Sequence, residues 1–365
     1  NVVRINTTQN VTNASNTSAT GLQVGRYTGG GSYNGYIDEL RFEFNDADRD
    51  AGWVATEFLN QSTTTDFYST STNLIGGSIS DSWYSTSWEE RQKITIPATA
   101  VDSDVTDYPV YVDLSTLGGD FFSSVASDGR DIRMTTGDGI TELPYELVNI
   151  STGGQTGELY FKTDLYNDSD SDFFIYFNNS DAVAYDRTDT YGLENVWTNN
   201  YLAVYHFEED AAGTGNLNLY TDSTSNQYHG DDETTSDDTT GFLGAGVEFG
   251  DDANDHLVLP NDALNGATDM TTSWWHNTNV ATDQVVVSGA NGTGGAANEY
   301  IMWLDNTTLF RYYHSNANEA FNLSDTVVNY NTGSWQFFMA TAQDDIDEMN
   351  LYVNGVGDTE NPDPQ

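Results

Sequence analysis

Short runs of apolar, aromatic and β-branched residues recur along the chain, and clusters of Gly, Asn, Asp and Ser separate them. Such runs predict β-strands, and their close spacing is typical of packed antiparallel sheets. Helical periodicity is nearly missing, and the one clear candidate helix, residues 48–59, carries Trp53, Val54 and Phe58 on its apolar side. The fold class predicted is therefore all-β. The clearest predicted strands are 92–97, 108–114, 131–135, 157–163, 172–178, 285–288, 300–304, 335–342 and 349–353.

Polar stretches divide this pattern into segments. Residues 1–20 are rich in Asn, Thr and Ser and are expected to form a loop, while residues 69–87 are rich in Ser, Thr and Gly and are expected to form a linker. A further boundary near residue 198 separates two strand-rich blocks. We therefore predict an N-terminal segment of residues 1–68, the linker 69–87, a β domain 88–198 and a C-terminal segment of residues 199–365.

Charge changes the picture most. The 365 residues hold 57 acidic and 11 basic side chains, a net charge of -46. Self-repulsion on this scale opposes folding at low salt, but molar salt shortens the screening length to about 3 Å and removes most of it. The composition therefore predicts a protein of an extreme halophile. It also argues against nucleic acid and anionic membranes as partners, because both would repel the chain.

Other residue types narrow the possible chemistry. Aromatic residues make up 13% of the chain, which argues against disorder. The sequence has no cysteine, which excludes disulfides, thiolate metal sites and cysteine nucleophiles. It has no apolar stretch of about 18 residues, so we expect no membrane insertion in this segment.

Several stretches of the C-terminal segment resemble the first strands of a laminin-G-like (LamG) domain, a concanavalin A-like lectin sandwich of jelly-roll type. The stretches are LAVYHFEE at 202–209, DSTSNQYHG at 222–230, VEFGD at 247–251, TSWW at 272–275 and LYVNG at 351–355. The last pieces of that family pattern appear at the other end of the chain. They are LQVGRY at 22–27, GYIDELRF at 35–42 and WVATEFLNQ at 53–61, the last resembling the helix that closes such domains.

The resemblance implies that residues 1–68 are the end of the domain type that residues 199–365 begin. A sandwich divided in this way is not stable alone, because it exposes core faces and sheet edges. The chain either closes the sandwich itself, as a circular permutation, or neighbouring copies or repeats exchange strands. The second arrangement is favoured here, and the first stays open.

The middle block resembles DUF2341, a domain of unknown function that often precedes LamG domains in secreted microbial proteins. The resemblance implies a second β-sandwich-like domain and an extracellular, cell-surface location. The residues that carry it are WEER at 88–91, PV at 109–110, SDGRDIR at 127–133, LPYE at 143–146 and IYFNN at 175–179.

A bound calcium ion is a tentative expectation from the LamG resemblance, because such sandwiches often hold Ca²⁺ at the rim through hard oxygen ligands. The resemblance places Asp38, Glu208 and Asp222 as candidate ligands, with Asn226 less certain. In so acidic a chain, however, any carboxylate can imitate a ligand.

Sugar binding is a second expectation, since lectin-like sandwiches stack exposed rings on sugars. Trp274 and Trp275 are neighbours on one predicted strand and so point to opposite faces. Trp275 matches the core tryptophan of the family, which would direct Trp274 outward as a candidate carbohydrate contact; packing of Trp274 at a domain contact explains it equally well.

Glycosylation is also expected, at a minority of the Asn-x-Ser/Thr sequons. The sequons lie at Asn6, Asn10, Asn13, Asn16, Asn60, Asn149, Asn167, Asn178, Asn291, Asn306 and Asn322.

No catalytic motif emerges. Glucanases of concanavalin A type need spaced Glu residues on one strand, and the nearest approach, Asp38-Glu39, lacks that spacing. We predict no enzymatic activity. Two functions remain: a structural or adhesive unit of a surface filament, sheath or repeat array, with the sandwich completed by a neighbour, and a calcium-dependent carbohydrate-binding adhesion module of a larger secreted or viral appendage protein.

Overall fold

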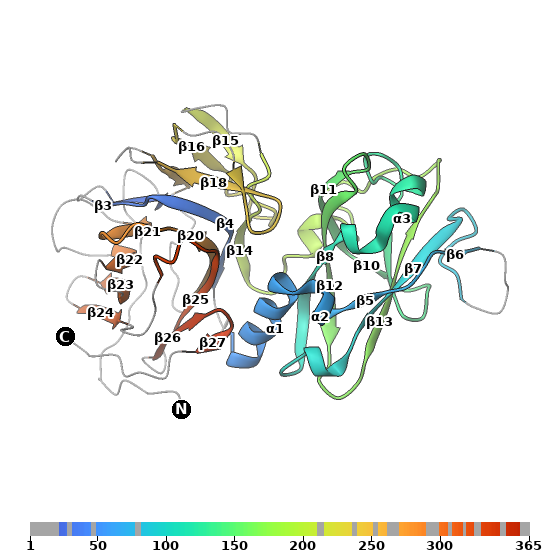
Figure 1. The fold of residues 1–365 in the computed structure, drawn as a ribbon, viewed down its shortest axis with the longest axis horizontal. Helices are drawn as coiled ribbons and strands as arrows, with labels where there is room; N and C mark the ends of the chain where they lie inside the picture. The colour runs from blue at the N-terminus through green and yellow to red at the C-terminus, as the bar shows by residue number, and fades with distance from the viewer. Residues whose placement is uncertain are drawn as a thin grey trace. The chain divides into compact units, whose positions relative to one another are not determined.

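The computed structural model divides the chain into two compact units, Asn1–Ala51 with Asn200–Gln365, and Gly52–Asn199 (Figure 1). The residues that it describes are 22–27, 31–44, 49–76, 82–209, 215–235, 239–250, 255–260, 270–289, 299–305, 309–316, 319–324, 330–343 and 348–357.

The first unit is a sandwich of two antiparallel sheets. One sheet has the strand order β15 (Asn216–Tyr220), β16 (Gly230–Asp232), β19 (Leu257–Leu259), β1 (Leu22–Val24), β21 (Gln284–Gly289), β22 (Glu299–Asp305), β23 (Leu309–Asn316) and β24 (Glu319–Ser324). The other has the order β17 (Thr239–Thr240), β18 (Ala245–Phe249), β4 (Gly35–Phe44), β20 (Met270–Asn277), β25 (Gln336–Gln343), β26 (Glu348–Val353) and β27 (Val356–Gly357), with β14 (Tyr201–Tyr205) also paired to β4. A short ribbon joins β2 (Arg26–Tyr27) to β3 (Gly31–Ser32).

The core of the sandwich follows from alternation along β4, with one irregularity. Ile37, Leu40 and Phe42 all belong to the buried core cluster, although Ile37 and Leu40 are three positions apart. The extra residue is accommodated at Glu39, which has φ +51°, and the pairing with β20 shifts at this point. A bulge of this kind restores the apolar face after the break.

Strands from the two ends of the chain lie side by side in both sheets. β1 pairs with β19 and β21, and β4 pairs with β14, β18 and β20. In Figure 1 this places the blue β4 beside the yellow β18 and the orange-brown β20. Within the single chain, the N-terminal strands thus complete the sandwich. Completion by a neighbouring copy, the arrangement favoured from the sequence, stays a prediction. A strand tethered to its own sheet has a high effective concentration, which favours closure within one chain.

The second unit holds two further antiparallel sheets. The larger has the order β10 (Glu142–Leu143), β9 (Arg133–Thr136), β13 (Ser171–Phe177), β7 (Glu90–Ile96) and β5 (Ser69–Thr70), with β6 (Leu74–Ile75) also paired to β7. The smaller is β11 (Tyr145–Ser151), β12 (Thr156–Leu165) and β8 (Val105–Asp113). The helical segments are α1 (Ala51–Ser62), α2 (Thr64–Phe67), α3 (Gly118–Ser124) and the 3₁₀ turns η1 (Ala98–Ala100), η2 (Leu114–Leu117) and η3 (Leu193–Asn195).

The predicted helix exists, but it packs in the second unit instead of closing the sandwich. The Trp53 ring lies edge-on to Tyr108 of β8 at 5.0 Å, and the Asn60 amide bonds both backbone groups of Tyr111. β8 is an edge strand, so the Asn60 amide occupies backbone groups that a further strand would otherwise pair. These contacts attach α1 to the smaller sheet.

The segment 69–87 also differs from the expected linker. Its first residues form β5 and β6, which pair with β7 and extend the larger sheet of the second unit. Two short paired strands interrupted by polar residues lack the alternation that identifies a strand in a sequence.

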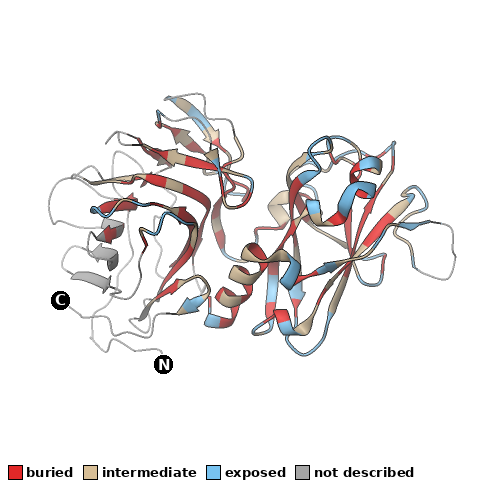
Figure 2. Ribbon diagram, in the orientation of Figure 1, coloured by how far each residue is buried: buried red, intermediate tan, exposed pale blue. Residues whose placement is uncertain are grey.

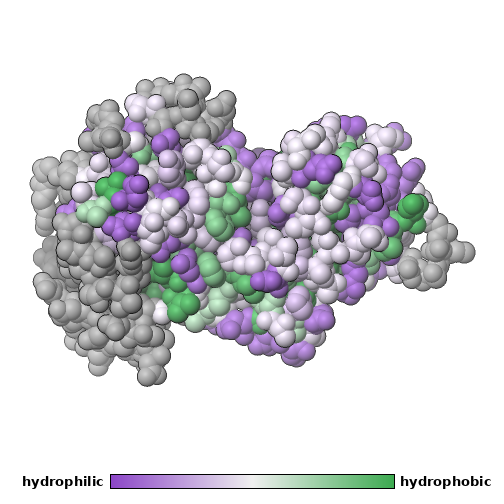
Figure 3. All heavy atoms as spheres, in the orientation of Figure 1, coloured by the Kyte–Doolittle hydropathy of each residue, from purple (hydrophilic) through white to green (hydrophobic). Residues whose placement is uncertain are grey.

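The all-β fold class is confirmed, and every strand named from the sequence overlaps an observed one. The strands of both units are mostly buried, while exposed residues gather in turns (Figure 2). The visible surface of the described residues is largely hydrophilic, with scattered apolar areas (Figure 3).

Candidate functional site

Three neighbouring strands place an aromatic ring between a carboxylate and an amide on the sandwich unit. Tyr36 of β4 lies opposite Glu248 of β18 on one side and opposite Asn277 of β20 on the other. The next residue, Ile37, is in the core, so the Tyr36 side chain belongs to the opposite face of the sheet. All three residues of this row are partly exposed and accessible to a ligand.

The row borders a hollow of about 420 Å³, which we call the rim hollow. Gly35 has φ +149°, and a Cβ there would come within 2.5 Å of the Asn277 carbonyl oxygen, so glycine permits this close approach of β4 to β20. The lining residues are Asn34, Gly35, Tyr36, Glu248, Phe249, Gly250, Asn277, Thr278, Asn279 and Gly333.

The polar and aromatic groups of the rim hollow are suited to a neutral polar ligand. The charge of Glu248 raises the pKa of Tyr36, with burial and a hydrogen bond to the same carboxylate adding to the effect. Tyr36 therefore stays a neutral phenol at ordinary pH. The Trp335 ring lies 6.3 Å from the Tyr36 ring, centre to centre, and enlarges the aromatic surface beside the row.

Two of the predicted calcium ligands instead hold one turn in place. Asp38 is fully buried, and its Oδ2 accepts hydrogen bonds from the backbone N–H groups of Phe242 and Leu243, both at 2.8 Å. Glu208 Oε1 accepts from the Ala245 N–H at 2.5 Å. The structure thus brings Asp38 and Glu208 to the same turn, as acceptors for backbone donors.

The other two candidates form a separate group. Asp222 is fully buried, with Oδ1 accepting from the N–H groups of Val204 and Thr224 and Oδ2 from Thr224 Oγ1 and the Tyr228 N–H. Asn226 donates from Nδ2 to the Leu202 carbonyl at 2.9 Å.

Calcium binding stays a prediction. The described residues contain no group of three or more His, Asp or Glu side chains arranged to hold a metal. A Ca²⁺ ion bound through Asp38 or Asp222 would have to compete with the backbone donors that these carboxylates now accept.

The orientation predicted for the two tryptophans is wrong. Trp274 lies fully buried in the core cluster, where it stacks on Phe338 at 5.5 Å, so it is not accessible to a sugar. Trp275 points to the other face and stacks on Phe242 at 3.5 Å. β20 itself alternates without interruption, since its pairing with β25 runs from Met270 to His276 with no shift. A motif match that is one residue out of register is enough to exchange the two faces.

A buried charged cluster lies on β4 next to the bulge. Glu39 pairs with Arg41 at 2.7 Å and with His206 Nδ1 at 2.7 Å, and all three side chains are nearly inaccessible. Burial by itself would raise the pKa of Glu39, but His206 and Arg41 outweigh it and lower that pKa to about 2. Because His206 follows β14, the pair joins the two segments of the chain that build this sheet.

The sequons differ in accessibility. Asn60 is buried and both ends of its amide bond the backbone of Tyr111, so the folded chain cannot carry a glycan there. Asn149 and Asn178 are half-buried and donate to Glu158 and Glu90, whereas Asn167 is exposed. Modification of accessible sites stays a prediction. The sequons at Asn6, Asn10, Asn13, Asn16, Asn291 and Asn306, and the side chain of Asn322, lie outside the described residues.

Sequence reasoning missed the rim hollow. Tyr36 and Asn277 lie within or next to matched stretches, and a signal existed, because Tyr36 alternates with the apolar Ile37 and so had to face outward. The pairing that brings Glu248 and Asn277 to either side of Tyr36 joins segments more than 200 residues apart, and no local pattern reveals it.

Comparison with known proteins supports the sandwich assignment. A model of the concanavalin A-like lectin/glucanases superfamily, of laminin G type, matches residues 251–365. No curated protein and no solved structure matches the chain. No helix in the described part of the chain is long and apolar enough to cross a membrane. The matched residues belong to the first unit, whose two antiparallel sheets are consistent with a concanavalin A-like all-β sandwich. Domains of this kind are typically non-catalytic adhesion or carbohydrate-binding modules and are usually extracellular.

Proposed function

We propose that this chain is a non-catalytic extracellular adhesion module that binds saccharides in the rim hollow. The observation that carries the proposal is the row of Glu248, Tyr36 and Asn277 beside Trp335. Aromatic rings bury the apolar face of a sugar, and flanking carboxylate and amide groups bond its hydroxyls.

The hydrogen bonds and ion pairs of Asp38 and Glu39 support a non-catalytic role. Asp38 and Glu39 came closest to a catalytic pair, but Asp38 accepts backbone N–H groups and Glu39 is paired with Arg41 and His206. A glycosidase needs two carboxyl groups free to face the scissile bond. Neither residue meets that requirement in the folded chain.

The charge supports the proposed setting. A surface with a net charge of -46 is suited to molar salt, where self-repulsion is screened. Sugar stacking on neutral rings does not depend on long-range attraction, so it operates at such salt concentrations. We therefore place the module on the cell surface, or on a secreted or viral appendage, in a hypersaline environment.

The test is a glycan array probed with the full chain in 3 M NaCl, followed by titration of the best glycan against variants. Y36A and N277A should each weaken binding by about tenfold or more, because a lost stacking or hydrogen-bonding contact costs about 1–2 kcal/mol. Y166A, which removes an exposed tyrosine of the second unit, is the matched control. Equal binding by wild type and Y36A would refute the site.

Calcium dependence can be tested on the same samples. We propose that any calcium acts through Asp38 and Glu208 at the turn that they share. Binding that is unchanged after chelation and dialysis would remove calcium from the proposal while leaving the sugar site intact. A chelator-sensitive thermal midpoint, restored by Ca²⁺ and not by Mg²⁺, would support it.

A second candidate function is a structural unit of a filament or array. The observation in its favour is that β1 and β4 come from the far end of the chain, so exchange of these strands between copies would link them. The chain lacks cysteine, which allows a clean test with the facing pair Gln23→Cys and Val258→Cys. Oxidised monomers would indicate closure within each chain, and disulfide-linked ladders would indicate exchange.

A further inference from the structure

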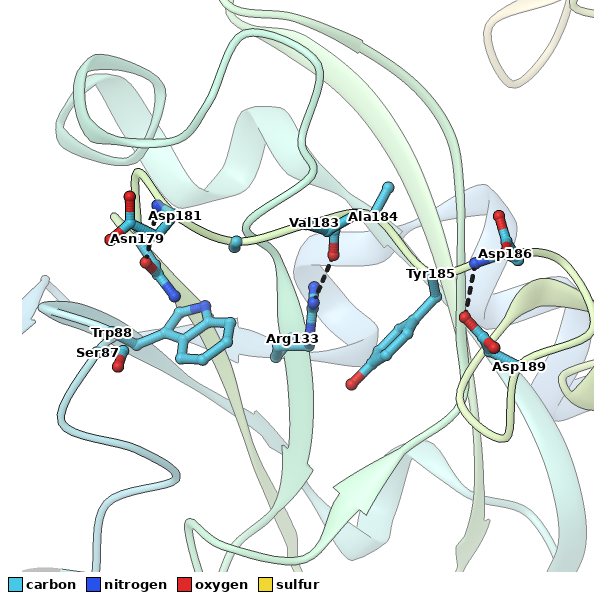
Figure 4. Close-up of a pocket in the computed structure, with 11 residues that line it drawn as sticks. Ser87, Trp88, Arg133, Asn179, Asp181, Val183, Ala184, Tyr185, Asp186 and Asp189 are labelled. Carbon is cyan, nitrogen blue, oxygen red and sulfur yellow. Dashed lines mark hydrogen bonds between the residues drawn. The ribbon is translucent and has the colours of Figure 1, made fainter.

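The second unit has its own hollow, of about 580 Å³, where the DUF2341-like stretches meet (Figure 4). It is lined by Trp88 and Arg133 and by residues of the segment 179–189, which contributes Tyr185. This volume lies in the range of small-molecule sites. Nothing in the comparisons covers this unit, because the matched family model begins at residue 251.

Arg133 holds the two rings in place. Its guanidinium carbon lies 5.2 Å from the centre of the Trp88 ring and 4.1 Å from that of Tyr185, and Figure 4 shows it between them. The polar ends of both rings are also bound, since Trp88 Nε1 donates to the Asp131 carbonyl at 2.6 Å and the Tyr185 hydroxyl donates to Glu142 at 2.7 Å. The rings are thus fixed before any ligand arrives, which lowers the entropic cost of binding.

Arg133 does not serve as an anion receptor. It is nearly inaccessible, and its terminal nitrogens donate to the carbonyls of Arg130, Ile132 and Val183. Its charge is balanced by Glu142, 3.6 Å from Nε. The guanidinium therefore acts as a spacer between the rings, and an anionic ligand would meet mainly the carboxylates around the hollow.

Polar groups that make no hydrogen bond to the described residues line the same hollow. Asn179 is more than nine-tenths buried, its Oδ1 accepts from the Asp181 N–H, and its Nδ2 lies toward Trp88 and donates to no other described residue. The carboxylates of Asp181 and Asp186 likewise accept no hydrogen bond within the described chain, and both side chains are exposed. The hollow thus offers one fixed donor and two free acceptors beside two rings.

We propose that this hollow is a second binding site, for a neutral saccharide of one or two rings. Half-exposed aromatic surface with separate donors and acceptors matches the apolar faces and hydroxyls of a sugar. Binding of a cation between the two rings is disfavoured because the Arg133 guanidinium already lies there. An anion is disfavoured because Asp181, Asp186 and Asp189 border the hollow. This site is independent of the rim hollow.

The test is saturation-transfer NMR and calorimetry on the full chain in 3 M NaCl, with maltose, cellobiose, lactose and mannobiose as probes up to about 20 mM. The double variant Asp181→Ala/Asp186→Ala removes both free acceptors from exposed positions and should weaken binding at least tenfold. D120A, at an exposed position on α3, is the control for loss of surface charge. W88A should abolish binding, with circular dichroism to check its fold. The variant Y36A should retain this binding component, which separates the result from the rim hollow.

Several outcomes would overturn the inference. They are the absence of binding by every probe, equal binding by wild type and the double aspartate variant, and displacement of the sugar by tetramethylammonium chloride. Affinity should change little between 1 M and 3 M NaCl, because a neutral ligand is insensitive to screening. A steep salt dependence would indicate a charged ligand and contradict the proposal.

Discussion

Protonation of one buried histidine should weaken the sandwich at mildly acidic pH. His276 on β20 is fully buried, and its Nδ1 accepts a hydrogen bond from Trp274 Nε1 at 3.1 Å. Its Nε2 lies 3.4 Å from the Tyr330 carbonyl oxygen, so the neutral ring carries its proton on Nε2. The groups packed around the ring are the uncharged rings of Phe338, Trp274 and Tyr33. Burial lowers the pKa of His276 from 6.5 to about 4.

The magnitude follows from linkage. The unfolded chain takes up a proton near pH 6.5, but the folded chain resists it down to about pH 4, so acid favours unfolding between these values. Each tenfold change in proton affinity corresponds to about 1.4 kcal/mol, which gives about 3 kcal/mol for the whole interval. This stability is present above pH 6.5 and is lost as pH falls toward 4. The lowered pKa of Glu39 acts in the same direction only below about pH 4.5.

The assay compares urea unfolding of wild type and His276→Gln at constant 3 M NaCl, from pH 8 to pH 4.5. Glutamine can accept from Trp274 and donate to the Tyr330 carbonyl, but it does not titrate. The many carboxylates are common to both proteins and cancel in the difference. Relative to the variant, wild type should lose about 2.5 kcal/mol between pH 8 and pH 4.5. Parallel curves across this range would refute the assigned pKa and the burial that causes it.

Further changes test the fold directly. Trp274→Ala should cost about 3–5 kcal/mol as a core cavity, measured by urea unfolding, whereas Trp274→Phe should leave glycan affinity unchanged. Gly35→Ala should cost about 1–3 kcal/mol, measured in the same way, because a Cβ meets the Asn277 carbonyl at a φ that alanine rarely adopts. Asn60→Ala should cost about 2–3 kcal/mol by leaving both backbone groups of Tyr111 unpaired, and mass spectrometry should find Asn60 without a glycan. Dilution from 3 M to 0.1 M NaCl should lower the thermal midpoint steeply, followed by circular dichroism, because the net charge of -46 is then unscreened.

Most of the strands could be predicted from the sequence because the residue types within each strand are enough to indicate it. β8 and β13 consist mainly of β-branched and aromatic residues, and such runs indicate a strand without information from distant parts of the chain. The pairing of the N-terminal β4 with β20 needed a different kind of evidence, the order of short motifs within a known pattern. β5 and β6 could not be predicted from either kind of evidence, because a two-residue strand in a polar sequence shows no alternation of apolar and polar residues.

The orientation of Trp274 and Trp275 could not be derived from alternation alone. Adjacent residues face opposite ways, so an error of one position in matching a strand exchanges the two faces. β20 pairs with β25 without a shift from Met270 to His276, and Met270 and Trp274 both lie in the core cluster. The motif match gave the core position to Trp275, and only the packing of the closed sandwich shows that Trp274 occupies it.

In a chain with 57 acidic residues, an acidic residue in the sequence is weak evidence for a binding site. The burial and the hydrogen bonds of each carboxylate show which ones have a structural role. Asp38, Asp131 and Asp222 are nearly inaccessible, and each accepts at least two backbone N–H groups. A buried carboxylate is stable only when such donors or a cation satisfy it, so these residues hold turns together. Asp181 and Asp186 differ because they are exposed, their carboxylates accept no hydrogen bond from the described residues, and they border an aromatic hollow. In so acidic a chain, an exposed carboxylate that accepts no hydrogen bond and lies next to aromatic rings is therefore better evidence for a ligand than an acidic cluster in the sequence.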